Sequence, residues 1–359
     1  MVSVFLAFLL TCILTGLIIR YQFLHETFSS DSDFDSPQKF HNTPTPRIGG
    51  LAIYIAILCG AIIRLFFNYP SGLTALMLLA IGFPAFFFGL LEDLTKKISP
   101  RIRLLACAAS ALLAIYFLGI RVQSTNVVWL DILFSVPAIS VLLTCIMLAG
   151  LTNAYNIIDG FNGLACMVGI LTLSAIGYVA FRVNDYLILF ITVLIISSIF
   201  GFFIWNYPRG LIFLGDSGAY LIGFLVGTLS ILLINRNGEV SPWFACLINI
   251  YPAFETIFSM WRKKFIKKMS VGVPDGVHLH MLIYGRVARF IRLGNNESNF
   301  SGNARTSPFL WLLASLSIFP AVIFWANDVA LQVLTVLFCA SYIYIYRAIV
   351  LFKVPSWAK

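Results

Sequence analysis

The chain has 359 residues, of which 60% are hydrophobic, 15% are aromatic and only 11% are charged, and its formal net charge is +9. A soluble globular domain carries about 25% charged residues, so this composition excludes that class and predicts an all-α polytopic integral membrane protein. The positive charge therefore indicates contact with a membrane surface and with anionic solutes, and no nucleic acid partner is expected.

Eleven apolar segments are predicted to cross the bilayer, because each approaches the roughly 20 residues that a spanning helix needs. They are 4–19, 49–67, 73–91, 102–120, 132–151, 164–181, 186–204, 217–234, 242–261, 308–326 and 329–352. Arg20 follows the first segment and no basic residue precedes it, which is the reverse of a signal peptide, so we expect this segment to remain as an anchor. All seven cysteines fall inside these segments, so neither a disulfide framework nor a thiolate metal site is expected.

The distribution of Lys and Arg predicts the orientation, because short loops rich in these residues stay in the cytoplasm. One set of alternate loops, with the C-terminal tail, carries 20 of the 24, and these segments are 20–48, 92–103, 152–163, 205–216, 262–307 and the tail from 347. The N-terminus is therefore expected in the periplasm and the C-terminus in the cytoplasm, as in a multi-pass protein of a bacterial inner membrane. This basic face would attract inner-leaflet lipids and anionic soluble substrates.

The first of these loops ends in the motif PTPRIGG, residues 44–50. Pro44 and Pro46 stiffen the approach to the membrane, and the two glycines free the backbone as it enters the next helix. Arg47 would lie at the membrane surface, where a guanidinium group can hold a phosphate with two parallel hydrogen bonds. The alternative is an ordinary arginine that only obeys the positive-inside rule.

Two adjacent carboxylates, Glu92 and Asp93, stand in the motif GLLEDLTKK where the third apolar segment ends. Like charges at a lipid boundary repel each other, so this pair predicts a bound cation or a shared proton. The alternative is an exposed helix end in which Glu92 pairs with Lys96, four residues further on.

The stretch LTNAYNIIDGFNG, residues 151–163, is unusually polar for this chain, and we interpret it as the floor of an active site. Asn153, Asn156 and Asp159 are three residues apart, which places two amides and a carboxylate along one face of a helical turn or two. Gly160 lets the backbone turn or lets a ligand come close. The alternative is a polar loop that joins two membrane helices.

Asp216 lies between Gly215 and Ser217, directly before an apolar segment. Its carboxylate can cap the helix that begins there, or it can bind a hard cation such as Mg²⁺, which prefers oxygen ligands. We favour the cation, because the glycine leaves room for a phosphate.

A further carboxylate, Glu255, lies about 10 Å along the helix axis from Arg262. At that depth an unpaired charge costs about 2 to 3 kcal/mol, so we expect a partner or a function for it. His278 and His280 follow in the longest loop and face one side if that piece is extended, which suits contact with an anion or proton transfer. Zinc would need more His or Cys nearby, and the loop has none.

After the histidines, apolar and basic residues alternate at helical spacing, a pattern that predicts a helix lying on the inner membrane surface. The apolar positions are Leu282, Ile283, Val287, Phe290 and Ile291, and the basic ones are Arg286, Arg289 and Arg292.

Counting eleven crossings places all of these polar motifs on the same face of the membrane. Carboxylates and cations gathered there fit a reaction between an anionic lipid and an anionic soluble donor, with a divalent metal between them. A transporter for an anionic solute is the alternative from another class, but it predicts polar residues through the middle of the bilayer and internal repeats, and the sequence has neither.

Five motifs in this order, PTPRIGG, GLLEDLTKK, NAYNIIDGFNG, FLGDSG and PDGVHLHMLIYGR, resemble those of the polyprenyl-phosphate N-acetylhexosamine-1-phosphate transferases. The chain is more similar to the WecA-like members than to the MraY members. The resemblance implies one membrane-embedded transferase domain, 1–359, with its active site in the cytoplasmic loops 20–48, 92–101, 152–163, 205–216 and 262–307. It also implies transfer of a phospho-sugar from a UDP-N-acetylhexosamine to undecaprenyl phosphate, with release of UMP, at the start of O-antigen or related glycan synthesis.

The same resemblance implies roles for single residues. Asp216 matches the aspartate that binds Mg²⁺, for which Mn²⁺ is an alternative, and Glu92 and Asp93 match an acidic pair followed by the lysine at Lys96. Asn153, Asn156 and Asp159 match a run that handles nucleotide and phosphate, while His278 and His280 match positions that contact the diphosphate. Asp93 would accept the proton of the lipid phosphate, or an aspartate would form a covalent intermediate.

Four positions depart from the family pattern: Glu92 replaces an aspartate, Asn162 stands where a second acid is common, Met281 occupies a histidine place and Gly276 an arginine place. Glu92, Asn162 and Met281 favour, to a small degree, a further alternative, an inactive relative that is kept for assembly. The sequence names neither the sugar, for which GlcNAc is the default, nor the oligomeric state, and a homodimer is compatible with it.

Overall fold

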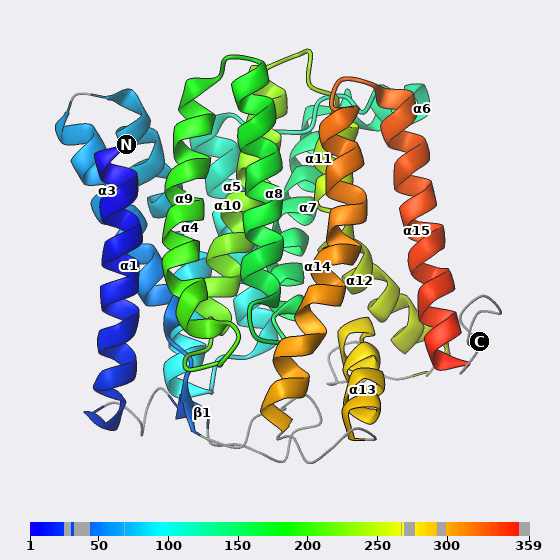
Figure 1. Ribbon diagram of the computed structural model, residues 1–359. Coiled ribbons are helices and arrows are strands. Elements are labelled where there is room, and N and C mark those ends of the chain that lie inside the picture. The colour runs from blue at the N-terminus through cyan, green and yellow to red at the C-terminus, as the bar shows by residue number, and fades with distance from the viewer. Residues whose placement is uncertain are drawn as a thin grey trace.

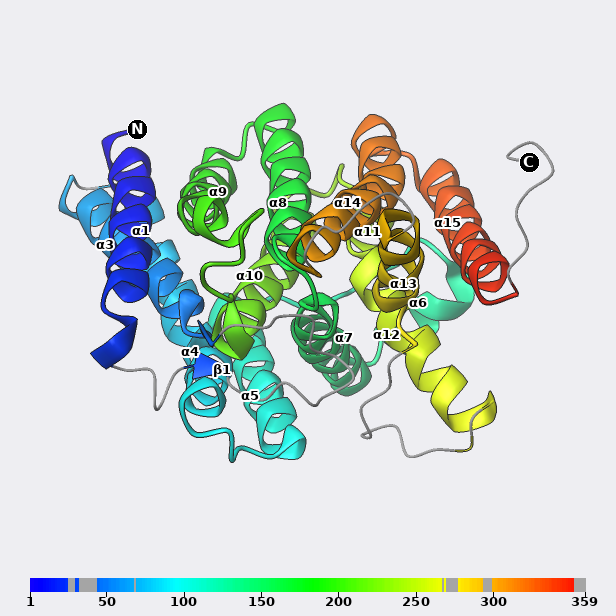
Figure 2. The same ribbon diagram turned by 60° about the horizontal axis from the view of Figure 1, so that its bottom comes forward.

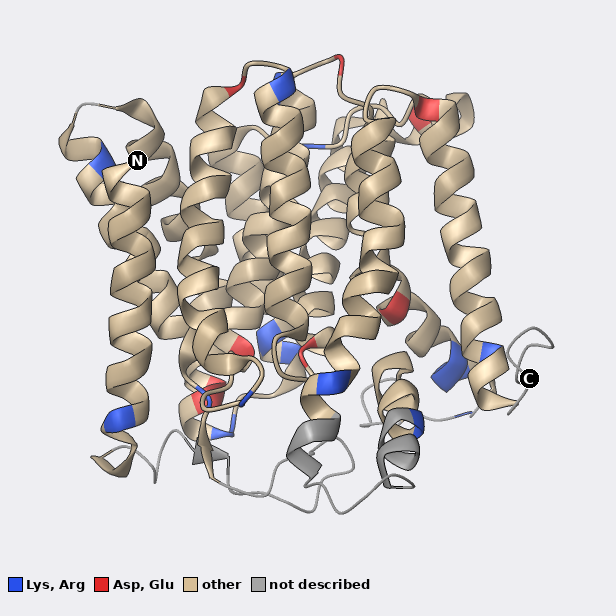
Figure 3. Cartoon of the chain, in the orientation of Figure 1, with Lys and Arg blue, Asp and Glu red and all other residues tan. Residues whose placement is uncertain are grey.

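The polar motifs are carried by an upright bundle of helices. The computed structural model describes residues 1–24, 30–31, 44–67, 69–266, 268, 277–292 and 299–351. Figure 1 shows the N-terminus in the upper part of the bundle and the end of α15, where the described chain finishes, at its lower side. The charged residues gather toward the two ends in Figure 3, and the end where the described chain finishes is called the lower end below.

Ten helices in the described chain are long and apolar enough to cross a membrane. They are α1 (Val2–Arg20), α3 (Gly49–Phe66), α4 (Pro70–Thr95), α5 (Pro100–Leu118), α7 (Pro137–Ile158), α8 (Leu164–Arg182), α9 (Tyr186–Asn206), α10 (Gly215–Arg236), α14 (Asn299–Ile323) and α15 (Asp328–Val350). The shorter elements are η1 (Gln22–Leu24), α6 (Val128–Phe134), α11 (Pro242–Ile248), α12 (Ile250–Trp261), η2 (Arg262–Ile266) and α13 (Leu279–Arg292). Two short strands, β1 (Ser30–Asp31) and β2 (Thr45–Pro46), pair antiparallel. The polytopic, nearly all-helical class predicted from the sequence is therefore confirmed.

The predicted segment 242–261 differs from the other ten, because it consists of two short helices, α11 and α12, that meet at Asn249. The Asn249 side chain donates a hydrogen bond to the carbonyl of Ala245 at 2.9 Å and another to Ser230 Oγ at 3.0 Å. Pro252 has no N–H to continue the first helix, but it is tolerated in the first turn of a new one. The apolar run therefore predicted the position of this segment but not its break.

Helix α10 lies at the centre of the bundle, and 94% of its most apolar 18-residue stretch is buried inside the protein. Both views show other helices around it (Figures 1 and 2). Gly50, at the start of α3, allows the closest of these contacts, because a Cβ atom there would lie 2.2 Å from the backbone nitrogen of Gly218. The second glycine of PTPRIGG is thus required for the packing of α3 on the first turn of α10.

The basic helix predicted after the histidines exists as α13, but its orientation is not the expected one. In Figure 1 it stands beside the lower parts of α14 and α15 instead of lying across the end of the bundle. Its apolar positions Leu282 and Ile283 pack against the protein core. The side chains predicted to complete the stripe, from Val287 onward, lie outside the described residues, and so do Gly276 and most of the loop 20–48.

Candidate active site

The carboxylate of Asp93 holds the N-terminus of α10. Its oxygens accept hydrogen bonds from the backbone nitrogens of Asp216 at 2.8 Å and Ser217 at 3.0 Å, and from Ser217 Oγ at 2.7 Å. Asp93 is fully buried, and Gly89 lets α4 come this close, since a Cβ atom at Gly89 would lie 2.8 Å from the Cα atom of Ser217. Asp93 therefore caps α10 from a different helix and fixes the position of Asp216.

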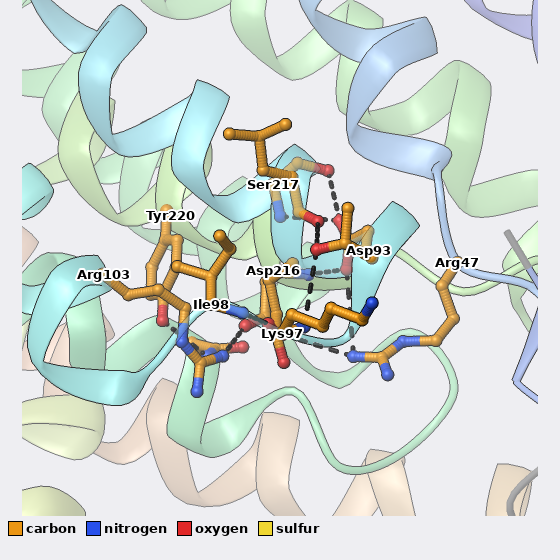
Figure 4. Close-up of polar contacts among 12 residues, drawn as sticks. Arg47, Asp93, Lys97, Ile98, Arg103, Asp216, Ser217 and Tyr220 are labelled. Atoms are coloured by element: carbon orange, nitrogen blue, oxygen red, sulfur yellow. Dashed lines mark hydrogen bonds and ion pairs between the residues drawn. The ribbon is translucent and has the colours of Figure 1, made fainter. Parts of the chain in front are cut away.

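Asp216 lies between two arginines, as Figure 4 shows. Arg47 Nη2 is 3.3 Å from one carboxylate oxygen and 3.8 Å from Asp93 Oδ1, and Arg103 Nη1 donates to the other oxygen of Asp216. The side chains of Asp216, Arg103 and Arg47 are 8%, 18% and 22% exposed, respectively. We call Arg47, Asp93, Arg103 and Asp216 the arginine–aspartate cluster.

Backbone pairing brings Arg47 to this cluster. Phe213 N donates to the carbonyl of Pro46 at 2.8 Å, and Gly49 N and Gly50 N donate back to the carbonyls of Phe213 and Leu214. Gly215 has a positive φ of 77°, and a Cβ atom there would lie 2.0 Å from the carbonyl oxygen of Arg47. The backbones of the motifs PTPRIGG and FLGDSG are therefore hydrogen-bonded to each other.

From the sequence, Arg103 is only one of the positive-inside residues, and its position in the site is not predicted. Ser99 accepts a hydrogen bond from Ile102 N, and Pro100 follows at the first helical position. Both are helix-start signals that the sequence displays. They place Arg103 in the first turn of α5, where its side chain reaches back to Asp216.

Glu92 does not point into the cluster as Asp93 does. Its Oε2 accepts a hydrogen bond from Ile98 N at 2.7 Å and so closes the turn between α4 and α5. Lys96, in a left-handed conformation at the end of α4, is exposed on the same turn. The two predicted carboxylates therefore have different roles, because Glu92 closes a turn and Asp93 caps α10.

Residues 152–158 are part of α7, so the predicted loop 152–163 is a loop only from Asp159 onward. Asn156 Nδ2 donates to the hydroxyl of Tyr220 at 3.0 Å, on the first turns of α10, while Asn153 is half-buried one turn earlier. Burial, and then the negative charge of Asp216, raise the pKa of Asp159 to about 7, although Arg47 lowers it in part. Asp159 is therefore close enough to the arginine–aspartate cluster for their charges to interact.

Glu255 has hydrogen-bond partners, as expected for a carboxylate at its predicted depth in the membrane. Its Oε1 lies 3.0 Å from His278 Nδ1 and accepts a hydrogen bond from Leu279 N at 3.3 Å, and its Oε2 accepts one from the hydroxyl of Tyr342. The rings of His278 and His280 are stacked, with centroids 5.3 Å apart and planes 5° from parallel. We call Glu255, His278, His280 and Tyr342 the glutamate–histidine cluster.

The loop after α7 joins the two clusters. The ring of Phe161 meets that of His280 edge to face at 5.6 Å, and a Cβ atom at Gly160 would lie 3.0 Å from His280 Nε2. Burial lowers the pKa of His280 to about 4, so this ring is neutral near pH 7. The loop that begins at Asp159 therefore lies against His280 at the start of α13.

Asn162, which departs from the family pattern, ties this loop to its neighbours. Its Nδ2 donates to the carbonyl of Pro208 at 3.2 Å, its backbone nitrogen donates to Asn303 Oδ1 at 2.9 Å, and its carbonyl accepts from Ser307 Oγ at 2.7 Å. An aspartate at 162 could not donate to Pro208, so the amide serves a structural purpose here.

Replacing Asn162 with aspartate is expected to lower the stability of the protein by about 1 to 3 kcal/mol, because the hydrogen bond to the carbonyl of Pro208 is lost and a buried carboxylate faces that carbonyl instead. The measurement is the midpoint of thermal unfolding in detergent. Asn184→Asp is the matched control, since Asn184 is exposed and its Oδ1 accepts from Tyr186, which an aspartate can also do. Equal midpoints for the two variants would contradict this role of Asn162.

Within the described residues no group of three or more His, Cys, Asp or Glu side chains is arranged to hold a metal ion. The donors present are carboxylate oxygens, with Asp216 foremost. This set fits Mg²⁺, which is commonly bound by one or two carboxylates while waters and substrate phosphates complete its shell. It does not fit a closed protein site of the kind that zinc forms.

Comparison with known proteins gives consistent matches along the chain. The model of the glycosyl transferase family 4 matches residues 75–234, from α4 to the end of α10. The probable undecaprenyl-phosphate N-acetylglucosaminyl 1-phosphate transferase of Bacillus subtilis is 30% identical over 69% of this chain and 68% of its own length. The undecaprenyl-phosphate alpha-N-acetylglucosaminyl 1-phosphate transferase of Thermotoga maritima is 26% identical over 79% and 81%. A phospho-N-acetylmuramoyl-pentapeptide-transferase of Streptococcus agalactiae is 24% identical over 86% and 93%.

Proposed function

The chain belongs to the glycosyl transferase family 4, and on that premise we propose that it transfers a phospho-N-acetylhexosamine from a UDP-sugar to undecaprenyl phosphate. An oxygen of the lipid phosphate attacks the β-phosphorus of the donor, the bond to the α-phosphate breaks, and UMP leaves. GlcNAc is the proposed sugar, because it is the one in the names of the Bacillus and Thermotoga relatives. The lower end of the bundle is proposed to face the cytoplasm of a bacterial cell, and the product would begin O-antigen or related glycan synthesis.

One observation carries this proposal: Asp216 stands at the N-terminus of a buried helix, with Arg47 and Arg103 on either side. Both substrates are anions. Two guanidinium groups are donors suited to phosphate oxygens. A membrane protein with this arrangement at the edge of its apolar region can bring a lipid phosphate and a soluble diphosphate together.

Asp216 would hold Mg²⁺ or Mn²⁺. When bound, the ion neutralises charge on the donor diphosphate as the bond to UMP breaks. Arg47, Lys96 and the histidines at 278 and 280 would donate hydrogen bonds to phosphate oxygens, and Asn153 and Asn156 would bind the nucleotide end.

The surroundings of Asp93 favour a positioning role over the one expected from the sequence. Its carboxylate is fully buried, and its oxygens already accept three hydrogen bonds from Asp216 and Ser217. A proton acceptor needs an oxygen that reaches the lipid phosphate. We therefore propose that Asp93 acts by holding Asp216 in place.

The test is turnover by purified protein in proteoliposomes with undecaprenyl phosphate, a panel of UDP-N-acetylhexosamines and either Mg²⁺ or Mn²⁺. We expect UMP and a butanol-extractable sugar lipid from UDP-GlcNAc, loss of both with EDTA, and recovery when the metal is restored. Uptake of an anionic solute without UMP release would instead support a transporter. Absence of both activities with every donor would support an inactive relative.

A further inference from the structure

Glu255 is a carboxylate in an apolar part of the protein, with only 1% of its surface exposed. It lies in α12, the second half of the broken segment, and outside the five motifs that carry the family resemblance. Burying such a charge is costly unless hydrogen bonds satisfy both oxygens, and here they do. Both oxygens of Glu255 therefore have hydrogen-bond partners, and the identity of these partners indicates the role of Glu255.

Three groups converge on this carboxylate from other elements. His278 Nδ1 and Leu279 N share one oxygen, and the hydroxyl of Tyr342, on α15, takes the other. Arg262 adds a second attachment, because its Nη1 donates both to the carbonyl of Val277 and to the hydroxyl of Tyr346. The segment that carries the histidines is therefore held from α12 and from α15.

The hydrogen bond to Glu255 decides which nitrogen of His278 is available. A carboxylate can only accept, so Nδ1 carries the proton and Nε2 is left for another partner. Carboxylates orient histidines in this way in hydrolases and in metal sites, where they fix both the tautomer and the plane of the ring. His280, neutral and stacked on His278, packs against its other side without supplying a competing positive charge.

We propose, on the basis of the function proposed above, that Glu255 is a positioning residue that holds His278 through the proton on Nδ1 and directs Nε2 at a substrate phosphate, to which Nε2 donates a hydrogen bond once the ring is doubly protonated. Glu255 itself does not touch the substrate. Its effect on the reaction passes through His278 alone. A residue that acted only on the stability of the fold would lack this dependence on one partner.

The first test is a double-mutant cycle that measures kcat for UMP release. Glu255→Leu fills the space but cannot accept a hydrogen bond, and we expect it to lower kcat at least tenfold. In a His278→Ala background the same change is expected to cost less than twofold, because the group it positions is gone. Glu255→Gln, which can still accept from Nδ1, is expected to stay within about threefold of wild type. Equal losses in both backgrounds, or a Gln variant as impaired as the Leu variant, would overturn the proposal.

The second test needs no turnover. The chain has four histidines, so ¹⁵N-histidine spectra of the purified protein are simple to assign with His278→Ala as the reference. Nδ1 of His278 is expected to carry the proton in the wild type and in Glu255→Gln, and to lose it to Nε2 in Glu255→Leu. A ring protonated only on Nε2 in the wild type would refute the proposal even if UMP is released. A wild-type protein that shows the Nδ1 proton but releases no UMP would instead contradict the proposed function.

A third comparison holds even if Glu255→Leu fails to fold. The amide nitrogen of Gln at 278 approximates Nε2, and that of Asn approximates Nδ1. We expect His278→Gln to keep at least fivefold more activity than His278→Asn, and the opposite order would overturn the assignment of Nε2 to the substrate.

Discussion

Replacing Asp216 with asparagine is expected to lower kcat for UMP release at least 100-fold in proteoliposomes. The change keeps the shape of the side chain but removes the negative charge between Arg47 and Arg103, and with it the principal ligand proposed for the metal. Loss of one group placed for charge stabilisation in an active site commonly costs a factor of about 10² to 10³. The hydrogen bonds from the backbone of residues 216 and 217 to Asp93 do not involve this side chain, so the protein should still fold.

Asp185→Asn is the matched control for this variant. Asp185 is also a buried aspartate paired with an arginine, Arg236, and it caps α9, but it lies at the upper end of the bundle. Its replacement is expected to lower the midpoint of thermal unfolding and leave kcat within twofold of wild type. A folded Asp216→Asn variant with more than a tenth of wild-type turnover would exclude Asp216 from the reaction.

Hydropathy was sufficient to predict most of the fold, because a spanning helix in lipid satisfies its own backbone and needs only a long apolar run. Ten of the eleven predicted segments each contain one long helix in the structure, although the segment 132–151 begins in α6 and only its greater part is α7. The exception needed knowledge of tertiary contacts, since Asn249 bonds to Ser230 on another helix at the break. The orientation of α13 also depended on contacts, in this case with α14 and α15, that its own periodicity does not reveal.

Parity of the crossings predicted that the polar motifs would gather at one end, and the structure brings Arg47, Asp93, Asp216 and the histidine segment there. What each side chain does was harder to predict. Asp93 and Asp216 are 123 positions apart, and no local pattern indicates that one caps the helix of the other. Arg103 and Tyr342 were missed for the same reason, because their partners come from distant parts of the chain.

The departure at Glu92 illustrates how the structure changes the interpretation of a motif. From the sequence, a glutamate in place of an aspartate raised the alternative of an inactive relative. Its longer side chain reaches the backbone nitrogen of Ile98, away from the oxygens that hold α10. The substitution therefore falls on the carboxylate that closes a turn, while Asp93 and Asp216 retain the arrangement on which the proposed reaction depends.

Asp93→Asn is expected to reduce both turnover and stability, and the combination distinguishes the two roles considered for this residue. An amide has one oxygen for three donors, and its NH₂ group would face the N–H or hydroxyl of Ser217. The expected cost is about 1 to 3 kcal/mol of unfolding free energy, reduced in part by the relief of repulsion between the two aspartates. Turnover should fall at least 100-fold, because Asp216 is no longer held in place.

Two further measurements decide the matter. Ser217→Ala removes one of the three donors and should cause a smaller loss of stability, about 0.5 to 1.5 kcal/mol, with turnover within about tenfold of wild type. In an Asp216→Asn background, Asp93→Asn should reduce turnover little further, because a positioning residue has no effect once the group it positions is disabled. A variant at 93 with the thermal stability of the wild type and no turnover would instead return Asp93 to the role of proton acceptor, since only a group that takes part in the chemistry can be lost at no cost to the fold.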